Sequence, residues 1–261
     1  MAFQDYNPGQ GILHSKFVGL ANFEYMFQMS DIAQVLRNTV TIAVGKIIGN
    51  IIFPLIFALL LNELALKRLK RPIQTIVYLP YFLSWVILAK IVLNIFGYTG
   101  PINHLIQLFG GDPINFFGEA KLFQPLVIGT DIWKGFGYNT VVYLAAILGV
   151  DKSLYEAAAV DGAGMFTRFF KITLPQLKSV SLVIVFIHII WTAINFDFIW
   201  VMTEGGPNYA TETLPIMIYR YSMKTFDVGA ASALSTMMFT AMFIMFLFYY
   251  RKRMKISDDL S

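Results

Sequence analysis

The stretch that decides the fold is EAAAVDGA at residues 156–163, followed by ITLP at residues 172–175. It is the most polar long interval in the second half of a very apolar chain, and a long apolar segment lies on each side of it. The run from Ser153 to Ala159 consists largely of strong helix formers with a face of small residues. Asp161-Gly162 ends that run, because glycine tolerates the positive φ of a helix terminus.

A second short helix is expected from Met165 to Ile172, stopped by Pro175. The two segments together predict a helix-turn-helix at the membrane surface, with a small alanine face open to a partner. An ordinary polar loop is the alternative, and Glu-Ala-Ala alone would fit it about as well. The full pattern at this spacing is far more specific.

Composition indicates an integral membrane protein. The 261 residues are 57% hydrophobic and 14% charged, with a mean hydropathy of +0.62, whereas soluble domains carry roughly 25% charged residues. The absence of cysteine excludes disulfides, iron–sulfur clusters and thiolate zinc sites. The three histidines lack metal-ligand spacing, nothing suggests nucleic acid, and no catalytic motif is present. The sequence therefore predicts neither a metal site nor a catalytic residue.

Five apolar segments are long enough to cross a bilayer, which requires roughly 20 residues. Lys and Arg are concentrated in 62–71, in 149–179 and after residue 250, with four in each segment. The positive-inside rule therefore predicts that these segments are cytoplasmic, and an odd number of spans puts the N-terminus outside. The expected spans are about 38–61, 73–96, 122–148, 180–202 and 228–250.

Polar side chains inside the spans suggest a substrate path, because they are costly in a membrane. In the fourth span, His188, Trp191, Thr192 and Asn195 share one helix face at i, i+3, i+4 and i+7. An aromatic plane beside hydrogen-bonding groups suits a sugar ring, whose C–H face stacks while its hydroxyls need partners.

The third span adds Gly135 and Tyr138 to this candidate path, with Lys134 beside them. Glycine there would admit a close ligand or a neighbouring helix. Helix–helix packing is the competing interpretation for all of these residues. Lys134 is alternatively expected to pair with Asp131, one turn away.

Several motifs together resemble the membrane subunits of binding-protein-dependent ABC importers, in the sugar-transporting group related to the maltose importer. The resemblance covers residues 17–250. The motifs that carry it are Asn38-Thr39, Tyr78-Leu79-Pro80, Trp133-x-Gly-x-Gly-Tyr138, Leu154-Tyr155-Glu156-Ala157-Ala158, and Thr203-x-Gly-Gly-Pro207 followed by Thr211-x-Thr-Leu214.

This resemblance implies an all-α, polytopic bundle of about five transmembrane helices with the type I ABC importer permease fold, in a bacterial cytoplasmic membrane. It divides the chain into an external or interfacial segment 1–37, a transmembrane domain 38–250 with a cytoplasmic coupling loop 150–176, and a cytoplasmic tail 251–261. The ATPase-coupling residues implied are Glu156, Ala157, Ala158, Asp161, Gly162 and Ala163. The substrate-path residues implied are Gly135, Tyr138, His188, Trp191, Thr192 and Asn195.

The partners implied are a second permease subunit, two ATP-binding subunits, an extracytoplasmic solute-binding protein, a sugar or oligosaccharide, and membrane lipid. The chain itself is expected to bind no cofactor and to be no enzyme, with ATP and magnesium held by partner subunits. The loop 203–219 is a candidate contact for the binding protein.

The helix that usually comes first in this family is missing before the first span, so we expect either a truncated, processed or internally started chain or a natural five-span form. Other interpretations are an importer subunit for a non-sugar solute, a secondary transporter, or an intramembrane enzyme.

Overall fold

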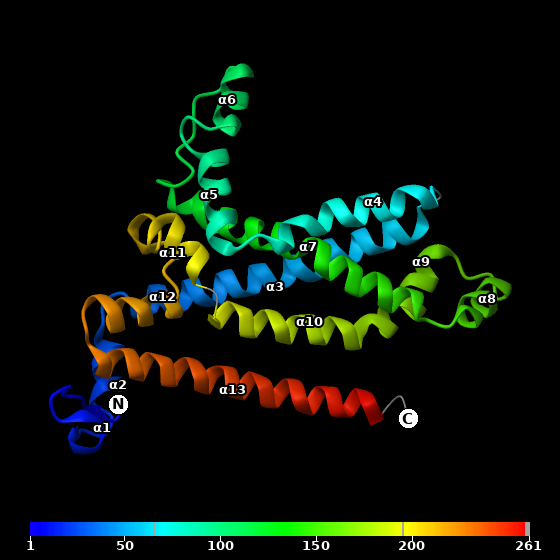
Figure 1. The fold of residues 1–261 in the computed structure, drawn as a ribbon. Coiled ribbons are helices and arrows are strands. Elements are labelled where there is room, and N and C mark those ends of the chain that lie inside the picture. The colour runs from blue at the N-terminus through cyan, green and yellow to red at the C-terminus, as the bar shows by residue number, and fades with distance from the viewer. Residues whose placement is uncertain (65, 195, 259–261) are drawn as a thin grey trace. The chain divides into compact units, whose positions relative to one another are not determined.

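We describe a computed structural model of the chain, which covers residues 1–64, 66–194 and 196–258. Most of the described chain is helical (Figure 1). The α-helices are α1 (Gly11–His14), α2 (Ala21–Gln28), α3 (Ile32–Glu63), α4 (Lys67–Tyr78), α5 (Trp85–Phe96), α6 (Pro101–Leu108), α7 (Ala120–Leu148), α8 (Lys152–Val160), α9 (Met165–Arg168), α10 (Leu174–Ile194), α11 (Asp197–Thr203), α12 (Leu214–Tyr219) and α13 (Val228–Asp258). The short elements are the 3-10 turns η1 (Leu79–Phe82) and η3 (Pro207–Tyr209), the π-helical turns η2 (Phe169–Thr173) and η4 (Arg220–Lys224), and the antiparallel strands β1 (Gln4–Asp5) and β2 (Lys16–Phe17).

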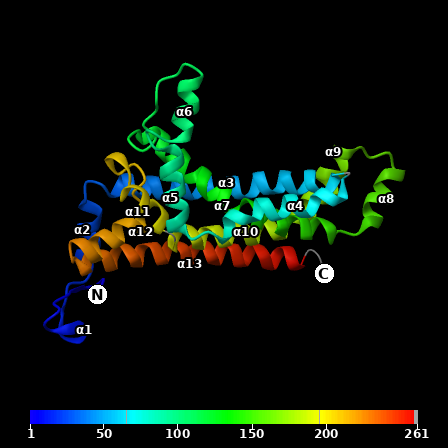
Figure 2. The ribbon, with the colours of Figure 1, turned by 45° about the horizontal axis from the view of Figure 1, so that its top comes forward.

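Four helical stretches in the described chain are long and apolar enough to span a membrane. They are Ile32–Glu63, Trp85–Leu108, Met165–Thr192 and Val228–Lys252. The expected span 122–148 is the single 29-residue helix α7, which is not among the four and carries Asp131 and Lys134 within it. The long helices α3, α7, α10 and α13 run without interruption in two views (Figures 1 and 2). The prediction of an all-α polytopic membrane protein is confirmed.

Two of the expected spans differ from the helices observed. The segment 73–96 is not one helix, because α4 ends at Tyr78, η1 follows, and α5 begins only at Trp85. Ser84 is extended, and its hydroxyl accepts a hydrogen bond from the Ile87 amide, which caps the start of α5. The segment 180–202 is also divided, because α10 ends at Ile194 and α11 starts at Asp197.

The chain divides into two compact units, and each has its own apolar core. The first unit comprises residues 1–45, 84–130 and 189–247. Its cluster joins α2, the start of α3, α12 and α13, and consists of Met26, Ile32, Val35, Leu214, Met217 and Leu234.

The second unit comprises residues 46–83, 131–188 and 248–261. Its core joins the second half of α3 with α7 and α10. Tyr143 is fully buried at its centre, and its hydroxyl lies 2.9 Å from the Ser181 hydroxyl. The cluster consists of Leu55, Ala58, Leu61, Tyr143, Leu144, Ile147, Leu177 and Ile184. This packing brings the predicted coupling loop and part of the predicted substrate path into one unit.

Candidate functional site

The EAAAVDGA stretch forms α8 and the turn that ends it. Asp151 caps the start of α8, and its carboxylate accepts a hydrogen bond of 2.9 Å from the Ser153 amide. At the other end, the Ala163 amide donates to the Ala158 carbonyl (2.8 Å) and the Gly162 amide donates to the Ala159 carbonyl (3.1 Å). These two hydrogen bonds together form a Schellman motif, which requires a residue with left-handed backbone after the last helical turn.

Gly162 is that residue, with a φ of +75°. The prediction that Asp161-Gly162 ends the helix through a positive φ is therefore confirmed. The expectation that Pro175 stops the second helix is wrong. The chain passes from α9 through the π-helical turn η2 directly into α10, and Pro175 lies in the first turn of α10. A π-turn shifts the hydrogen-bond pattern, so the proline's missing N–H and its ring are accommodated.

The surface around this turn exposes large apolar side chains. Val160 is 88% exposed and Phe166 is 72% exposed, and Met165 and Phe170 are also exposed. Glu156 and Ala157 are exposed as well, while Ala158 is half-buried. Exposed apolar side chains that lie close together in the chain are typical of a surface that contacts a partner or the membrane. The Tyr155 and Thr173 hydroxyls lie 2.9 Å apart and join α8 to η2.

A cluster of tyrosines lies where α7 meets the end of α4. The Tyr81 and Tyr138 rings stack with centroids 4.7 Å apart and an interplanar angle of 10°, and Tyr78 stacks on Tyr81 at 5.5 Å. A Cβ on Gly137 would lie 2.2 Å from the Val77 carbonyl oxygen, so only glycine permits this approach. Tyr138 is half-buried in this group of stacked rings, to which Tyr78 and Tyr81 belong although the sequence patterns did not single them out for the path.

The Lys134 side chain contacts the segment that joins α4 to α5, next to the tyrosine cluster. Its ammonium donates hydrogen bonds to the carbonyls of Pro80, Tyr81 and Leu83, and it lies 5.8 Å from the centroid of the Tyr81 ring. These carbonyls lie at the end of η1, where a cation interacts favourably with the helical carbonyls. The sequence offers Asp131 as an alternative partner for Lys134, but in the structure Asp131 forms its ion pair with Lys46.

A chain of buried polar contacts crosses α3, α7 and α10. The Lys46 ammonium lies 3.1 Å from one Asp131 oxygen, and the other accepts a hydrogen bond of 3.1 Å from Asn50. The Asn50 side-chain oxygen accepts a hydrogen bond of 2.9 Å from the Asn139 side-chain nitrogen, which lies 3.2 Å from His188 Nε2. Intramembrane charges are normally paired in this manner.

The predicted path residues therefore have different surroundings. Gly135 is buried, and a Cβ there would lie 2.5 Å from the Asn50 side-chain oxygen, while His188 is buried beside Asn139. Trp191 and Thr192 follow on α10 and are half-buried, and Asn195 lies outside the described residues. Substrate contact at these positions stays a prediction. The spacing of Asp131, Gly135 and Asn139 at i, i+4 and i+8 is the signal that could have indicated the polar contacts of α7.

The helical architecture and the surface turn define a multi-pass membrane protein that presents an exposed helical hairpin. Residues 50–254 match the family model described as binding-protein-dependent transport system inner membrane component, so the chain belongs to that family. This is a family of transport components in the inner membrane, and not of catalytic enzymes.

Known proteins resemble the chain over most of its length. It is 38% identical over 228 residues to the polygalacturonan/rhamnogalacturonan transport system permease protein YteP of Bacillus subtilis (strain 168), covering 86% of this chain and 70% of that protein. The crystal structure of a bacterial ABC transporter involved in the import of the acidic polysaccharide alginate matches with a TM-score of 0.85 at 29% identity, covering 92% of this chain and 85% of that one. A structure of the bacterial alginate ABC transporter in complex with an alginate pentasaccharide-bound periplasmic protein matches with a TM-score of 0.81 at 29% identity, covering 88% and 81%.

Proposed function

We propose that the chain is a transmembrane subunit of an ATP-driven importer of oligosaccharides. It forms half of the translocation path together with a second permease subunit, and it is coupled to cytoplasmic ATP-binding subunits through residues 150–176. ATP and magnesium are bound by those partner subunits, and an extracytoplasmic binding protein delivers the sugar.

The observation that carries this proposal is the exposed hairpin of α8 and α9. Val160, Met165 and Phe166 of this hairpin are exposed, as are Phe170 directly after it and Glu156 within α8. Burying one such side chain contributes roughly 1.5–3 kcal/mol, so a cleft that covers several of them would grip the hairpin firmly. Gly162 sets the angle between the two arms, which lets a rigid movement of the partner pass to α10.

An oligosaccharide is favoured by two arguments. The relatives that the chain resembles include transport proteins for polygalacturonan and alginate. In the second unit, the half-buried rings of Tyr78, Tyr81 and Tyr138 supply aromatic stacking partners, which suit a sugar ring. In the first unit, the half-buried Trp191 and Thr192 of α10 supply an aromatic plane and a hydroxyl.

Two glycines of the hairpin provide a matched test of coupling. Gly162 has a φ of +75°, whereas Gly164 has a φ of −66°, and a Cβ at either position meets no atom within 4 Å among the described residues. A β-branched residue is strongly disfavoured at positive φ only. Gly162→Val is expected to abolish substrate-stimulated ATPase activity in the assembled complex, and Gly164→Val to leave it near wild type. Equal activities of the two variants would contradict the coupling role.

Crosslinking tests the partner directly. Because the chain contains no cysteine, Ala158→Cys supplies a single thiol on the hairpin. A short bifunctional reagent is expected to join this thiol to the ATP-binding subunit in membranes. If the thiol never reaches a nucleotide-hydrolysing subunit, or if it reacts from the cell exterior, the proposal fails.

A further inference from the structure

The loop between α11 and α12 has a strained backbone. Three non-glycine residues, Glu204, Asn208 and Tyr209, have φ values of 53°, 50° and 55°, and Gly205 and Gly206 are also in the positive-φ region. Left-handed backbone at non-glycine residues costs of order 1–3 kcal/mol each and persists only where the surroundings enforce it. The loop 204–213 must therefore be held by contacts made elsewhere in its unit.

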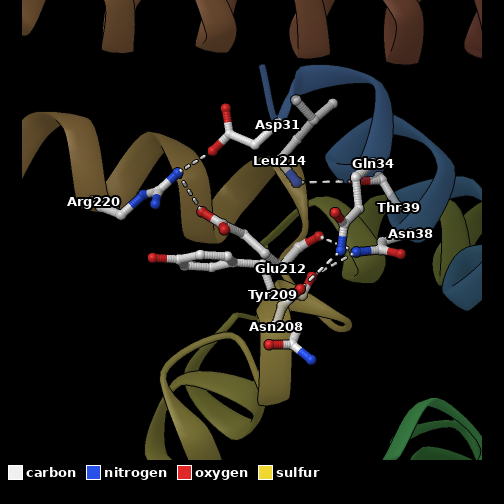
Figure 3. A network of polar contacts seen from close by, with 9 residues as sticks. All are labelled: Asp31, Gln34, Asn38, Thr39, Asn208, Tyr209, Glu212, Leu214 and Arg220. Atoms are coloured by element: carbon white, nitrogen blue, oxygen red, sulfur yellow. Dashed lines mark hydrogen bonds and ion pairs between the residues drawn. The ribbon is translucent and has the colours of Figure 1, made fainter. Parts of the chain in front are cut away.

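Helix α3 supplies many of these contacts (Figure 3). The side-chain nitrogen of Asn38 donates hydrogen bonds to the backbone carbonyls of Tyr209 (2.9 Å) and Glu212 (3.1 Å). Two of the motifs that carried the family resemblance, Asn38-Thr39 and the Thr203–Leu214 stretch, thus meet in space. The remaining bonds run from Gln34 to the Asn208 carbonyl, from the Leu214 amide to the Thr39 hydroxyl, and from Gln124 of α7 to the Ala210 carbonyl.

An ionic triad completes the attachment. Arg220 Nη2 lies 2.7 Å from Asp31 Oδ2 and 2.9 Å from Glu212 Oε1. The Glu212 side chain is only 1% exposed, whereas that of Asp31 is 26% exposed. Neither Glu212 carboxylate oxygen makes a hydrogen bond within the described residues. The attraction of Arg220 is therefore the main compensation for a buried charge at Glu212. The charge of Asp31 is stabilised by solvent as well, because its side chain is partly exposed.

The charge of Glu212 is balanced against its burial. Burial raises the pKa of Glu212 to about 7, the Arg220 guanidinium opposes that rise, and the Asp31 charge adds to it. The rings of Tyr209 and Tyr221 also lie near this site, 5.1 and 5.5 Å from the Arg220 guanidinium carbon. All of these groups belong to the first unit and lie outside the candidate spans.

We propose that Arg220 is a positioning residue for transport, which holds the loop 204–213 on α3 by compensating the buried Glu212 carboxylate. The loop then presents its exposed side chains, Asn208 and Tyr209, to the extracytoplasmic binding protein. Only the identity of this partner rests on the proposed function. The attachment of the loop is a property of this chain and is tested separately.

The pH dependence has a definite sign. Attachment of the loop 204–213 to α3, here called docking, buries Glu212 and raises its pKa from the ordinary 4.5 to about 7. Docking is therefore strongest at acid pH, weakens as the pH rises towards about 7, and is constant above it. Without Arg220 the pKa of Glu212 in the docked loop rises further. Arg220→Gln therefore weakens docking more at pH 8 than at pH 6. Each additional unit of pKa difference weakens docking tenfold at high pH.

Single thiols in the cysteine-free chain report docking. Ala210 is 8% exposed in the docked loop, and Met223 of η4 is 60% exposed. The ratio of labelling rates at Ala210→Cys and Met223→Cys by a membrane-impermeant maleimide, in the complex purified from membranes, cancels the pH dependence of the thiol itself. We expect a low ratio in the wild-type background, and in Arg220→Gln a ratio at least several-fold higher at pH 8 that falls back at pH 6.

The double variant E212Q/R220Q discriminates between a lost charge partner and a damaged fold. With no carboxylate to compensate, its labelling ratio is expected to be low at both pH values. Arg37→Gln, which removes an exposed arginine of α3, is the charge-matched control and should behave as wild type. An unchanged ratio in Arg220→Gln at pH 8, or a double variant that labels as fast as Arg220→Gln, overturns the proposal.

Transport measurements then test the positioning role. At pH 8, Arg220→Gln is expected to raise the apparent KM for the copurified binding protein several-fold with little change in kcat. A normal KM despite a raised labelling ratio would overturn the link to transport. Failure of the proposed function would appear differently, as the absence of binding-protein stimulation in wild type, with the labelling ratios unaffected.

Discussion

Gly137 is expected to be indispensable for the contact between α7 and the end of α4. In Gly137→Ala the new methyl group would lie 2.2 Å from the Val77 carbonyl oxygen and 2.5 Å from the Tyr78 Cα. Both are backbone atoms, so no change of rotamer relieves the overlap and the two segments must separate. Gly129 lies earlier on the same helix, and a methyl group there meets no atom within 4 Å in the described chain.

Comparison of Gly137→Ala with Gly129→Ala isolates the free-energy cost of the steric overlap. Both variants gain about 0.5–1 kcal/mol because alanine is the better helix former, and this gain cancels in the comparison. Overpacking of a close contact costs about 1–3 kcal/mol, so Gly137→Ala should be less stable than Gly129→Ala by that amount. For a chain of this size, 1 kcal/mol corresponds to about 2–4 °C in Tm.

Thermal unfolding of the two variants in the same detergent measures the difference. Uptake in membranes gives a second readout, because separation of the segments would move Tyr78 and Tyr81 away from Tyr138. We expect Gly129→Ala to match or exceed the wild-type Tm and to transport normally, and Gly137→Ala to lose both stability and uptake. Equal Tm values for the two variants would refute the close approach of α7 and α4.

The buried ion pair and the cap of α8 give two further predictions. Lys46→Met should destabilise the protein by about 3–5 kcal/mol, because it leaves Asp131 buried without its cation. The double variant K46M/D131N should recover most of the loss in Tm. A double variant as unstable as Lys46→Met would contradict this explanation. The hydrogen bonds from Ser153 lower the pKa of Asp151, so the start of α8 should be stable at neutral pH and loosen as the pH falls through that lowered pKa. Hydrogen exchange at the first amides of α8 measures this, and Asp151→Asn, which retains a capping side chain, should remove the pH dependence.

Local chemistry was predictable from the sequence where a single residue decides the backbone. The end of α8 follows from Gly162, because the Schellman ending needs a left-handed residue and glycine is the usual one. The same kind of reasoning fails at Pro175. A proline inside a helical pattern normally ends the helix, but η2 lies directly before it and absorbs the missing hydrogen bond.

Hydropathy predicted where the chain is apolar but not where its helices end. The segment 73–96 is predominantly apolar, yet η1 and the cap at Ser84 divide it. A serine three residues before Ile87 is a recognisable capping signal. The polar contacts among Asn50, Asn139 and His188 depend on the relative register of three helices, which a single sequence does not contain.

The buried charges of this chain argue for a general role in holding its segments. Lys46 with Asp131, and Glu212 with Arg220, are partnered within one unit each. A substrate that replaced one partner would have to supply its charge and then leave, and the surviving buried ion would be costly each time. Charged side chains inside this protein are therefore better suited to joining helices and loops than to binding a passing sugar. The half-buried tyrosine rings carry no such cost, because they can exchange one stacking partner for another without exposing an uncompensated charge.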